Sequence, residues 1–183
     1  GEHNVKNALG AVTLALQLDI KVEKIQAGLD QYNGVRRRFD IKYTLENGII
    51  IVDDYAHHPF EVTSTIQAAK SGWDRRLITV FQPHLFTRTR DFYQDFAKAF
   101  QKADILIVTD IYQAREMPIP GITAEKITDT AKNMGHKHVE YIPNQTQIAA
   151  RLSDIAQPND MIITMGAGNI WRQCERIHEA LCN

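Results

Sequence analysis

The chain has 183 residues, of which 44% are apolar and 23% are charged, and its formal net charge is −1. These values suit a soluble globular protein and exclude a general electrostatic attraction to nucleic acid or to an anionic membrane surface. No apolar run reaches the roughly 18 to 20 residues of a membrane helix, so we expect no membrane partner. Cys174 and Cys182 form neither a CxxC motif nor a disulfide framework, which favours a cytoplasmic protein.

The first 35 residues are predicted to form two helices. Apolar side chains recur with a helical period over residues 5–18 and again over residues 22–32, and Asn33-Gly34 is typical of a helix end. The helical pattern is present from the start and no initiator Met precedes it, so we expect the chain to be part of a longer protein. A domain boundary is predicted between residues 1–35 and 36–183.

The remaining residues alternate between strands and helices. An alternating segment at 39–45, a turn at 46–48 and an apolar run at 49–52 predict a hairpin whose second strand is buried. Short β-branched runs then alternate with amphipathic helices, which predicts an α/β, Rossmann-like, mainly parallel sheet with helices on both faces. The expected strands are 77–81, 105–108, 138–142 and 161–165, and the expected helices are 60–70, 90–101, 124–134, 145–156 and 169–181. Ligands of such sheets bind beyond the carboxyl ends of the strands.

Two clusters of polar residues lie before the parallel strands. His3, Asn4 and Asn7 share the start of the first helix. Asn4 suits a helix N-cap, but asparagine is also the side chain that pairs bidentately with an adenine edge. Arg36-Arg37-Arg38 precedes the first strand, where it is either a solvated sheet edge or an arginine fork for phosphate.

A third cluster, residues 53–59, directly follows a buried strand. It contains two carboxylates and two imidazoles, from Asp53, Asp54, His57 and His58. This combination is hard to explain by packing, and it suits either a metal ion or a combination of sugar hydroxyls and an anion. Pro59 suits the first turn of the next helix.

Two further clusters follow later strands. In residues 81–90, Thr87 or Thr89 is a candidate helix cap, and His84 and Arg88 are expected near the carboxyl edge of the sheet. Residues 165–171 form a glycine turn that either seats an anion on backbone N–H groups or is simply a tight turn. The chain contains neither GxGxxG nor GxxxxGK[ST], so a cradle for a triphosphate is expected elsewhere.

Taken in order, these clusters resemble the Mur ligase family. The matching motifs are EHNVKNALGA, GVRRRF, DDYAHHP, FQPHLFTRTRDF and GAGNIW, and together they span nearly the whole chain. The family joins a carboxylate to an amine with ATP, and DDYAHHP combined with FQPH..TRT resembles its alanine-adding branch. The resemblance implies an enzyme of peptidoglycan synthesis that phosphorylates UDP-N-acetylmuramate and lets L-alanine attack the acyl phosphate. A relative that recycles murein tripeptide is the alternative within the family.

The resemblance also implies roles for individual residues. Nucleotide-binding roles fall on His3, Asn4, Asn7, Arg38 and Asp54, and substrate-binding roles fall on Tyr55, His57, His84, Arg88, Gly166 and Asn169. Residues 1–35 would be the last helices of the central ATP-binding domain, and residues 36–183 the C-terminal domain. The P-loop lysine and the Mg²⁺ ligands would belong to N-terminal domains of the same polypeptide, so we expect no catalytic residue in this chain and no activity from it alone. Leu85-Phe86 departs from the polar pair of many members, which weakens an anion site there.

Two functions of other classes remain as alternatives. A metal-dependent phosphoesterase would use Asp53, Asp54, His57 and His58, but no further carboxylate cluster supplies the missing ligands. A noncatalytic nucleotide-binding module would be favoured by tight ATP binding of this chain alone. Bound transition metal would favour the phosphoesterase.

Overall fold

The computed structural model describes residues 2–32 and 34–182, except for the side chains of Glu2 and His3. The chain divides into two compact units, residues 1–35 and 36–183. The first unit consists of α1 (Glu2–Gln17) and α2 (Val22–Asp30). Large apolar side chains stay exposed along it, because two helices alone cannot cover their apolar faces; Val5, Leu9, Leu14 and Leu18 are each at least 60% exposed.

The second unit is built on one six-stranded sheet in the order β1-β2-β6-β3-β4-β5. The hairpin of β1 (Asp40–Thr44) and β2 (Ile50–Asp54) is antiparallel, and every other neighbouring pair is parallel. The parallel strands are β3 (Leu77–Phe81), β4 (Ile105–Val108), β5 (Val139–Tyr141) and β6 (Met161–Met165). The predicted α/β fold with a mainly parallel sheet is therefore confirmed.

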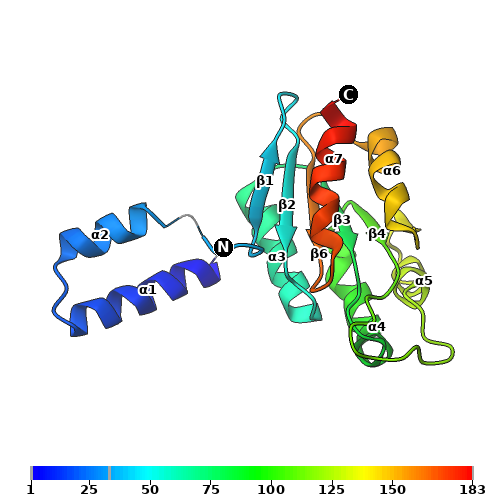
Figure 1. Cartoon of the computed structure of the whole chain (residues 1–183), viewed down its shortest axis with the longest axis horizontal. Helices are drawn as coiled ribbons and strands as arrows, with labels where there is room; N and C mark the ends of the chain where they lie inside the picture. The colour runs from blue at the N-terminus through cyan, green and yellow to red at the C-terminus, as the bar shows by residue number, and fades with distance from the viewer. Residues whose placement is uncertain (1, 33, 183) are drawn as a thin grey trace. The chain divides into compact units, whose positions relative to one another are not determined.

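Helices cover both faces of this sheet (Figure 1). One apolar core joins the sheet to α3 (Pro59–Gly72), α4 (Phe86–Ala99) and α5 (Glu125–Asn133), and the other joins it to α6 (Ile148–Ile155) and α7 (Gln173–Cys182). β2, β3, β4 and β6 are buried along their whole length, as near-continuous apolar runs between two helix layers should be.

In the second unit, three helix starts differ from those predicted by three or four residues. α4 begins at Phe86 rather than at residue 90, and its N-cap is Leu85, at φ 74°. Thr87 and Thr89 therefore do not cap α4, and the hydroxyl of Thr89 donates back to the Leu85 carbonyl at 2.9 Å. The stretches predicted as the starts of the last two helices are separate 3₁₀ turns, η2 (Gln145–Gln147) and η3 (Ile170–Arg172). A similar turn, η1 (Phe100–Lys102), follows α4.

The register of the sheet brings four strand ends to one level. Asp54 pairs with Met165, Met165 with Phe81, and Phe81 with Val108. The segments that follow β2, β6, β3 and β4 therefore start side by side. Most of the candidate residues lie in these segments.

Candidate functional site

The two aspartates at the end of β2 are both buried but have separate partners. Asp53 is 2% exposed; it accepts from the Arg37 Nε at 2.9 Å and from the Thr164 hydroxyl at 2.9 Å. Asp54 is 4% exposed and accepts three hydrogen bonds, from the N–H groups of Phe39 and Ala56 at 2.9 and 2.8 Å and from the Thr65 hydroxyl at 3.2 Å.

Burial is the main influence on Asp54 and raises the pKa of its carboxyl above the ordinary value, against the lowering effect of its hydrogen bonds and of Arg38. An ionised carboxylate has about four acceptor positions, and protein donors occupy three of them. Oδ1 accepts only one of these hydrogen bonds, so one of its acceptor positions has no donor among the described residues.

Arg37 connects the segment before β1 to the ends of β2 and β6, a role that the sequence analysis did not assign to it. Its Nη2 donates to the Gly166 carbonyl at 2.7 Å, while its Nε binds Asp53. Its guanidinium lies 4.8 Å from the centre of the Tyr55 ring, and its carbonyl accepts from the Tyr55 N–H at 2.7 Å. Arg37 has φ 60°, so these contacts hold a backbone conformation that L-residues rarely adopt.

Arg38 is more exposed than its neighbour. Half of its side chain, 52%, is exposed, and its nearest carboxylate is Glu61 at 3.6 Å. Glu61 accepts from the N–H groups of His57 and His58 at 3.0 and 3.2 Å and lies 3.2 Å from the His57 Nδ1. Burial alone would raise the pKa of Glu61, but these N–H groups and the charges of His57 and Arg38 lower it below its usual value.

Four rings form a row across the strand ends. Tyr55 meets His57 edge-on at 5.1 Å between centroids, His57 meets His84 at 6.0 Å, and His84 stacks on Tyr112 at 5.8 Å. The predicted residues Tyr55, His57 and His84 are thus neighbours, although they follow two different strands. Tyr112, from the segment after β4, was not predicted.

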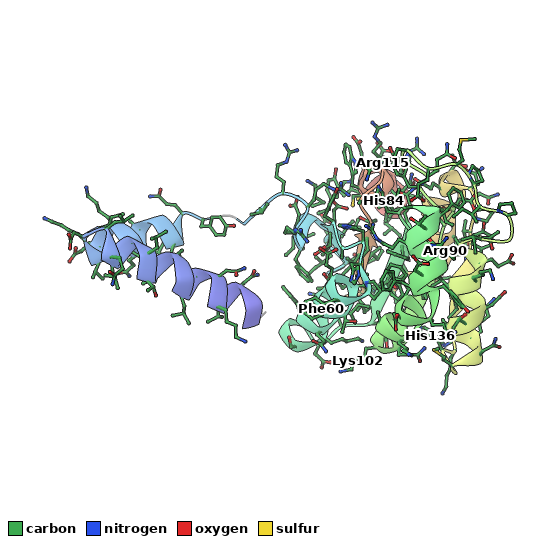
Figure 2. The ribbon with its side chains drawn as sticks, turned by 90° about the horizontal axis from the view of Figure 1, so that it is seen from below. Phe60, His84, Arg90, Lys102, Arg115 and His136 are labelled. Carbon is green, nitrogen blue, oxygen red and sulfur yellow. The ribbon has the colours of Figure 1, made fainter. Side chains whose placement is uncertain are left out.

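Arg88 lies beside His84, one turn into α4. Its Nη1 is 3.3 Å from the His84 Nδ1, and among the described residues it has no ion pair. Burial, followed by the charges of Arg88 and His57, lowers the pKa of His84 below its usual value. Arg115 also lowers it, and Figure 2 places Arg115 close to His84. The lowered pKa favours the neutral form of the His84 imidazole at pH 7.

The glycine turn after β6 is shaped by close packing. A Cβ on Gly168 would come within 2.4 Å of the Gln82 Oε1 and 2.6 Å of the Tyr112 ring, and a Cβ on Gly166 would lie 2.7 Å from the Gln82 carbonyl. The N–H and C=O of Gly166 are both used within the protein, by Asp54 and Arg37. Asn169 is exposed, and its Oδ1 accepts from the side-chain amide of Gln82 at 2.9 Å.

The adenine-side candidates lie in the first unit. Asn4 and Asn7 are exposed on α1, and the side chain of His3 lies outside the described residues. Within the described residues, no group of three or more His, Cys, Asp or Glu side chains is placed to hold a metal ion. The described helices also include none that is long and apolar enough to cross a membrane.

A family model described as "Mur ligase, glutamate ligase domain" matches residues 37–168, which contain all four rings and both aspartates. The chain belongs to the Mur ligase family. This membership confirms the resemblance seen in the motifs. The geometry of the two aspartates disfavours the phosphoesterase, because Asp53 and Asp54 accept hydrogen bonds from different protein donors and do not converge on one ion.

Curated relatives of this Mur ligase chain are named as alanine-adding ligases. "UDP-N-acetylmuramate--L-alanine ligase" of Geotalea uraniireducens is 49% identical over 181 residues, and the protein of that name from Geotalea daltonii is 48% identical. Each alignment covers 99% of this chain but 39% of the relative, so the chain spans about two fifths of the length of these curated relatives.

In solved structures of the family, too, nearly all of this chain matches less than half of the other chain. The UDP-N-acetylmuramate-alanine ligase of Thermotoga maritima superposes with a TM-score of 0.83 at 30% identity, covering 98% of this chain and 37% of that one. A murein peptide ligase of Psychrobacter arcticus superposes with a TM-score of 0.70 at 26% identity, covering 100% and 38%. The likeness to the alanine ligase is greater in both measures.

Proposed function

We propose that this chain is the C-terminal part of an ATP-dependent ligase that joins L-alanine to UDP-N-acetylmuramate in peptidoglycan synthesis. The observation that carries the proposal is the gathering of Tyr55, His57, His84 and Arg88 at one sheet edge, in a chain 48–49% identical to ligases of that name. The remaining N-terminal domains of the polypeptide are its partner in this function.

The reaction has two steps. A carboxylate oxygen of UDP-N-acetylmuramate takes the γ-phosphoryl group of ATP, and ADP leaves. The amine nitrogen of L-alanine then forms the C–N bond, the bond from the acyl carbon to the phosphate oxygen breaks, and phosphate leaves with that electron pair while the amine loses a proton. Both steps gather negative charge, so positioned cations and donors supply most of the catalysis.

Arg38 and Asp54 serve the nucleotide in this proposal. Arg38 is half-exposed and its ion pair with Glu61 is long, at 3.6 Å, so its guanidinium is available to phosphate oxygens. Asp54 would accept a ribose hydroxyl at the one acceptor position that the protein leaves open on Oδ1. His3, Asn4 and Asn7 would meet the adenine.

The incoming amino acid is assigned to His57, His84 and Arg88. Arg88 supplies a fixed positive charge for the alanine carboxylate. Neutral His84 beside it accepts or donates one hydrogen bond without adding a second full charge. Tyr55 borders this group, since it packs under Arg37 and against His57.

The glycine turn supplies the last part of the site. The Oδ1 of Asn169 accepts from Gln82 and Gln145, at 2.9 and 3.1 Å, and the amide donors of Asn169 would serve a substrate oxygen. Gly166 contributes through its conformation, φ 148°, because both of its backbone polar groups are occupied.

ATP is the cosubstrate, and its Mg²⁺ ligands are assigned to the N-terminal part of the polypeptide. The described residues do not fit a magnesium site, because Asp53 and Asp54 are held by separate protein donors. We therefore expect this chain alone to be inactive.

Complementation tests the proposal. The N-terminal three fifths of the polypeptide, this chain, and both together are assayed for ATP hydrolysis that depends on UDP-N-acetylmuramate and L-alanine. Activity only in the mixture supports the proposal. Activity with murein tripeptide but not with L-alanine would assign the chain to the recycling ligase. If neither the mixture nor the intact polypeptide is active with either substrate, both ligase assignments are refuted.

A further inference from the structure

Tyr112 lies at the end of the ring row, in the segment between β4 and α5. The Tyr112 and His84 rings are 5.8 Å apart between centroids and inclined by 18°, which is a stacked arrangement. Their backbones are also joined: Tyr112 N–H donates to the Pro83 carbonyl at 2.8 Å, and Leu85 N–H donates to the Tyr112 carbonyl at 3.0 Å. The residues directly before and after His84 are therefore both hydrogen-bonded to the backbone of Tyr112.

The glycine turn also packs against Tyr112. A Cβ on Gly168 would lie 2.6 Å from the Cγ of Tyr112, so the turn and the ring are in close contact. Tyr112 is 38% exposed, and its ring lies against His84, which follows β3, and against Gly168, which follows β6.

The same segment also holds the helix that carries Arg88. Glu116 accepts from the Thr87 N–H at 3.0 Å and from the Thr87 hydroxyl at 2.5 Å, which fixes the first turn of α4. The charged groups that face His84 are Arg88 from α4, His57 from the segment after β2, and Glu116 and Arg115 from this segment. Tyr112 is the uncharged aromatic side chain that packs against His84 among these charged groups.

We propose that Tyr112 is a positioning residue for the ligase reaction, which holds the His84 imidazole in the orientation that Arg88 and the incoming amino acid require. The inference rests on the proposed function. It assigns a role to the ring of Tyr112 and none to its hydroxyl, because the stacking and the backbone bonds do not involve the hydroxyl.

The experiment compares Tyr112→Leu, Tyr112→Phe and Gln113→Ala in the full-length ligase. Gln113 is the matched control, because it is the exposed neighbour on the same segment. An aromatic pair contributes modestly, so Tyr112→Leu should lower kcat/KM for L-alanine by roughly three- to tenfold and leave KM for ATP nearly unchanged. Tyr112→Phe should keep most of the activity. Thermal unfolding checks folding, and Tyr112→Met replaces the leucine variant if that variant does not fold.

A second readout separates positioning from general damage. Burial by the ring helps to keep the pKa of His84 low, so exposing the imidazole in Tyr112→Leu should raise it toward the ordinary histidine value. The acid limb of kcat/KM and the nuclear magnetic resonance titration of His84 should both move to higher pH. In a His84→Gln background, Tyr112→Leu should cost little more, because Tyr112 acts through His84.

The outcomes are distinct. A full-length wild-type protein without alanine-dependent ATP hydrolysis would refute the proposed function, whereas the His84 titration would still report on the stacking. An active wild type in which Tyr112→Leu matches Gln113→Ala would refute the positioning role alone. A Tyr112→Phe variant as impaired as Tyr112→Leu would also refute it, because the hydroxyl would then be the important group.

Discussion

Replacing Arg88 by alanine in the full-length ligase should impair recognition of the amino acid. L-Alanine offers a carboxylate, an amine and one methyl group, and a methyl-sized difference discriminates by only about 1–3 kcal/mol, so the carboxylate must supply much of the binding. The Arg88 Nη1 is 3.3 Å from the His84 Nδ1, and its nearest carbonyl, that of His84, is 3.5 Å away. These long contacts leave the guanidinium donors available.

A charge-assisted hydrogen bond contributes about 1.5–3 kcal/mol, which corresponds to roughly one to two decades. Arg88→Ala should therefore raise KM for L-alanine by roughly 10- to 100-fold and change KM for ATP far less. Arg88→Lys should recover part of the loss, because a point charge cannot reproduce the arginine fork. Arg90→Ala is the matched control, since Arg90 lies on the same helix but is exposed and paired with Asp91 at 2.7 Å.

Steady-state kinetics with L-alanine and ATP varied separately decides this prediction. Equal losses for both substrates would show that Arg88 maintains the arrangement of the domains and does not bind the amino acid. A loss in Arg90→Ala as large as that in Arg88→Ala would show that the effect is general electrostatics.

Four other predictions follow from the same structure. Asp54→Ala should raise KM for ATP by about tenfold or more if its free acceptor position binds the ribose, and an unchanged KM would make Asp54 purely structural. Calorimetry on this chain alone should show no submicromolar ATP affinity, because it has no P-loop. Gly168→Ala should destabilise the chain by about 1–3 kcal/mol in denaturant unfolding, whereas Gly72→Ala, with open space at its Cβ, should not. Glu61 has a lowered pKa, so its ionised carboxylate stabilises the folded chain above pH 4.5, its ordinary pKa, and this contribution is lost as the pH falls through the lowered pKa. The difference in unfolding free energy between wild type and Glu61→Gln should therefore shrink as the pH falls below 4.5, and a difference that grew would contradict this reasoning.

The fold could be predicted because its elements have strong local signals. β3 and β4 are short β-branched runs buried on both faces, and their predicted bounds agree with the structure. The start of α4 was missed because its N-cap is Leu85 in a left-handed conformation, held by Tyr112 and not by a capping side chain. Helix-start rules rely on Ser, Thr, Asp or Asn, and Thr87 and Thr89 were misleading for this reason.

The site could be predicted only in part. The rule that ligands bind at the carboxyl ends of parallel strands led to the clusters that hold His57, His84 and Arg88, and the family resemblance added Tyr55. The structure brings these four residues together. Tyr112 was missed although its segment also follows a parallel strand, because its contact with the site is the stacking of its ring on His84, which no local sequence signal indicates. The role of Arg37 was hidden for another reason: it depends on a left-handed backbone and on contacts to Asp53 and Gly166.

The polar side chains at this edge of the sheet form two groups, those whose hydrogen bonds are made within the protein and those that keep available donors. Asp53 and Arg37 have all their principal contacts within the unit, so they fix the relative positions of the segments after β2 and β6. Arg38, Arg88 and Asn169 keep donors that the described residues leave available. Because the available donors stand on backbone segments that the other contacts fix, a ligand at this edge would meet segments already in place, which lowers the ordering cost of binding.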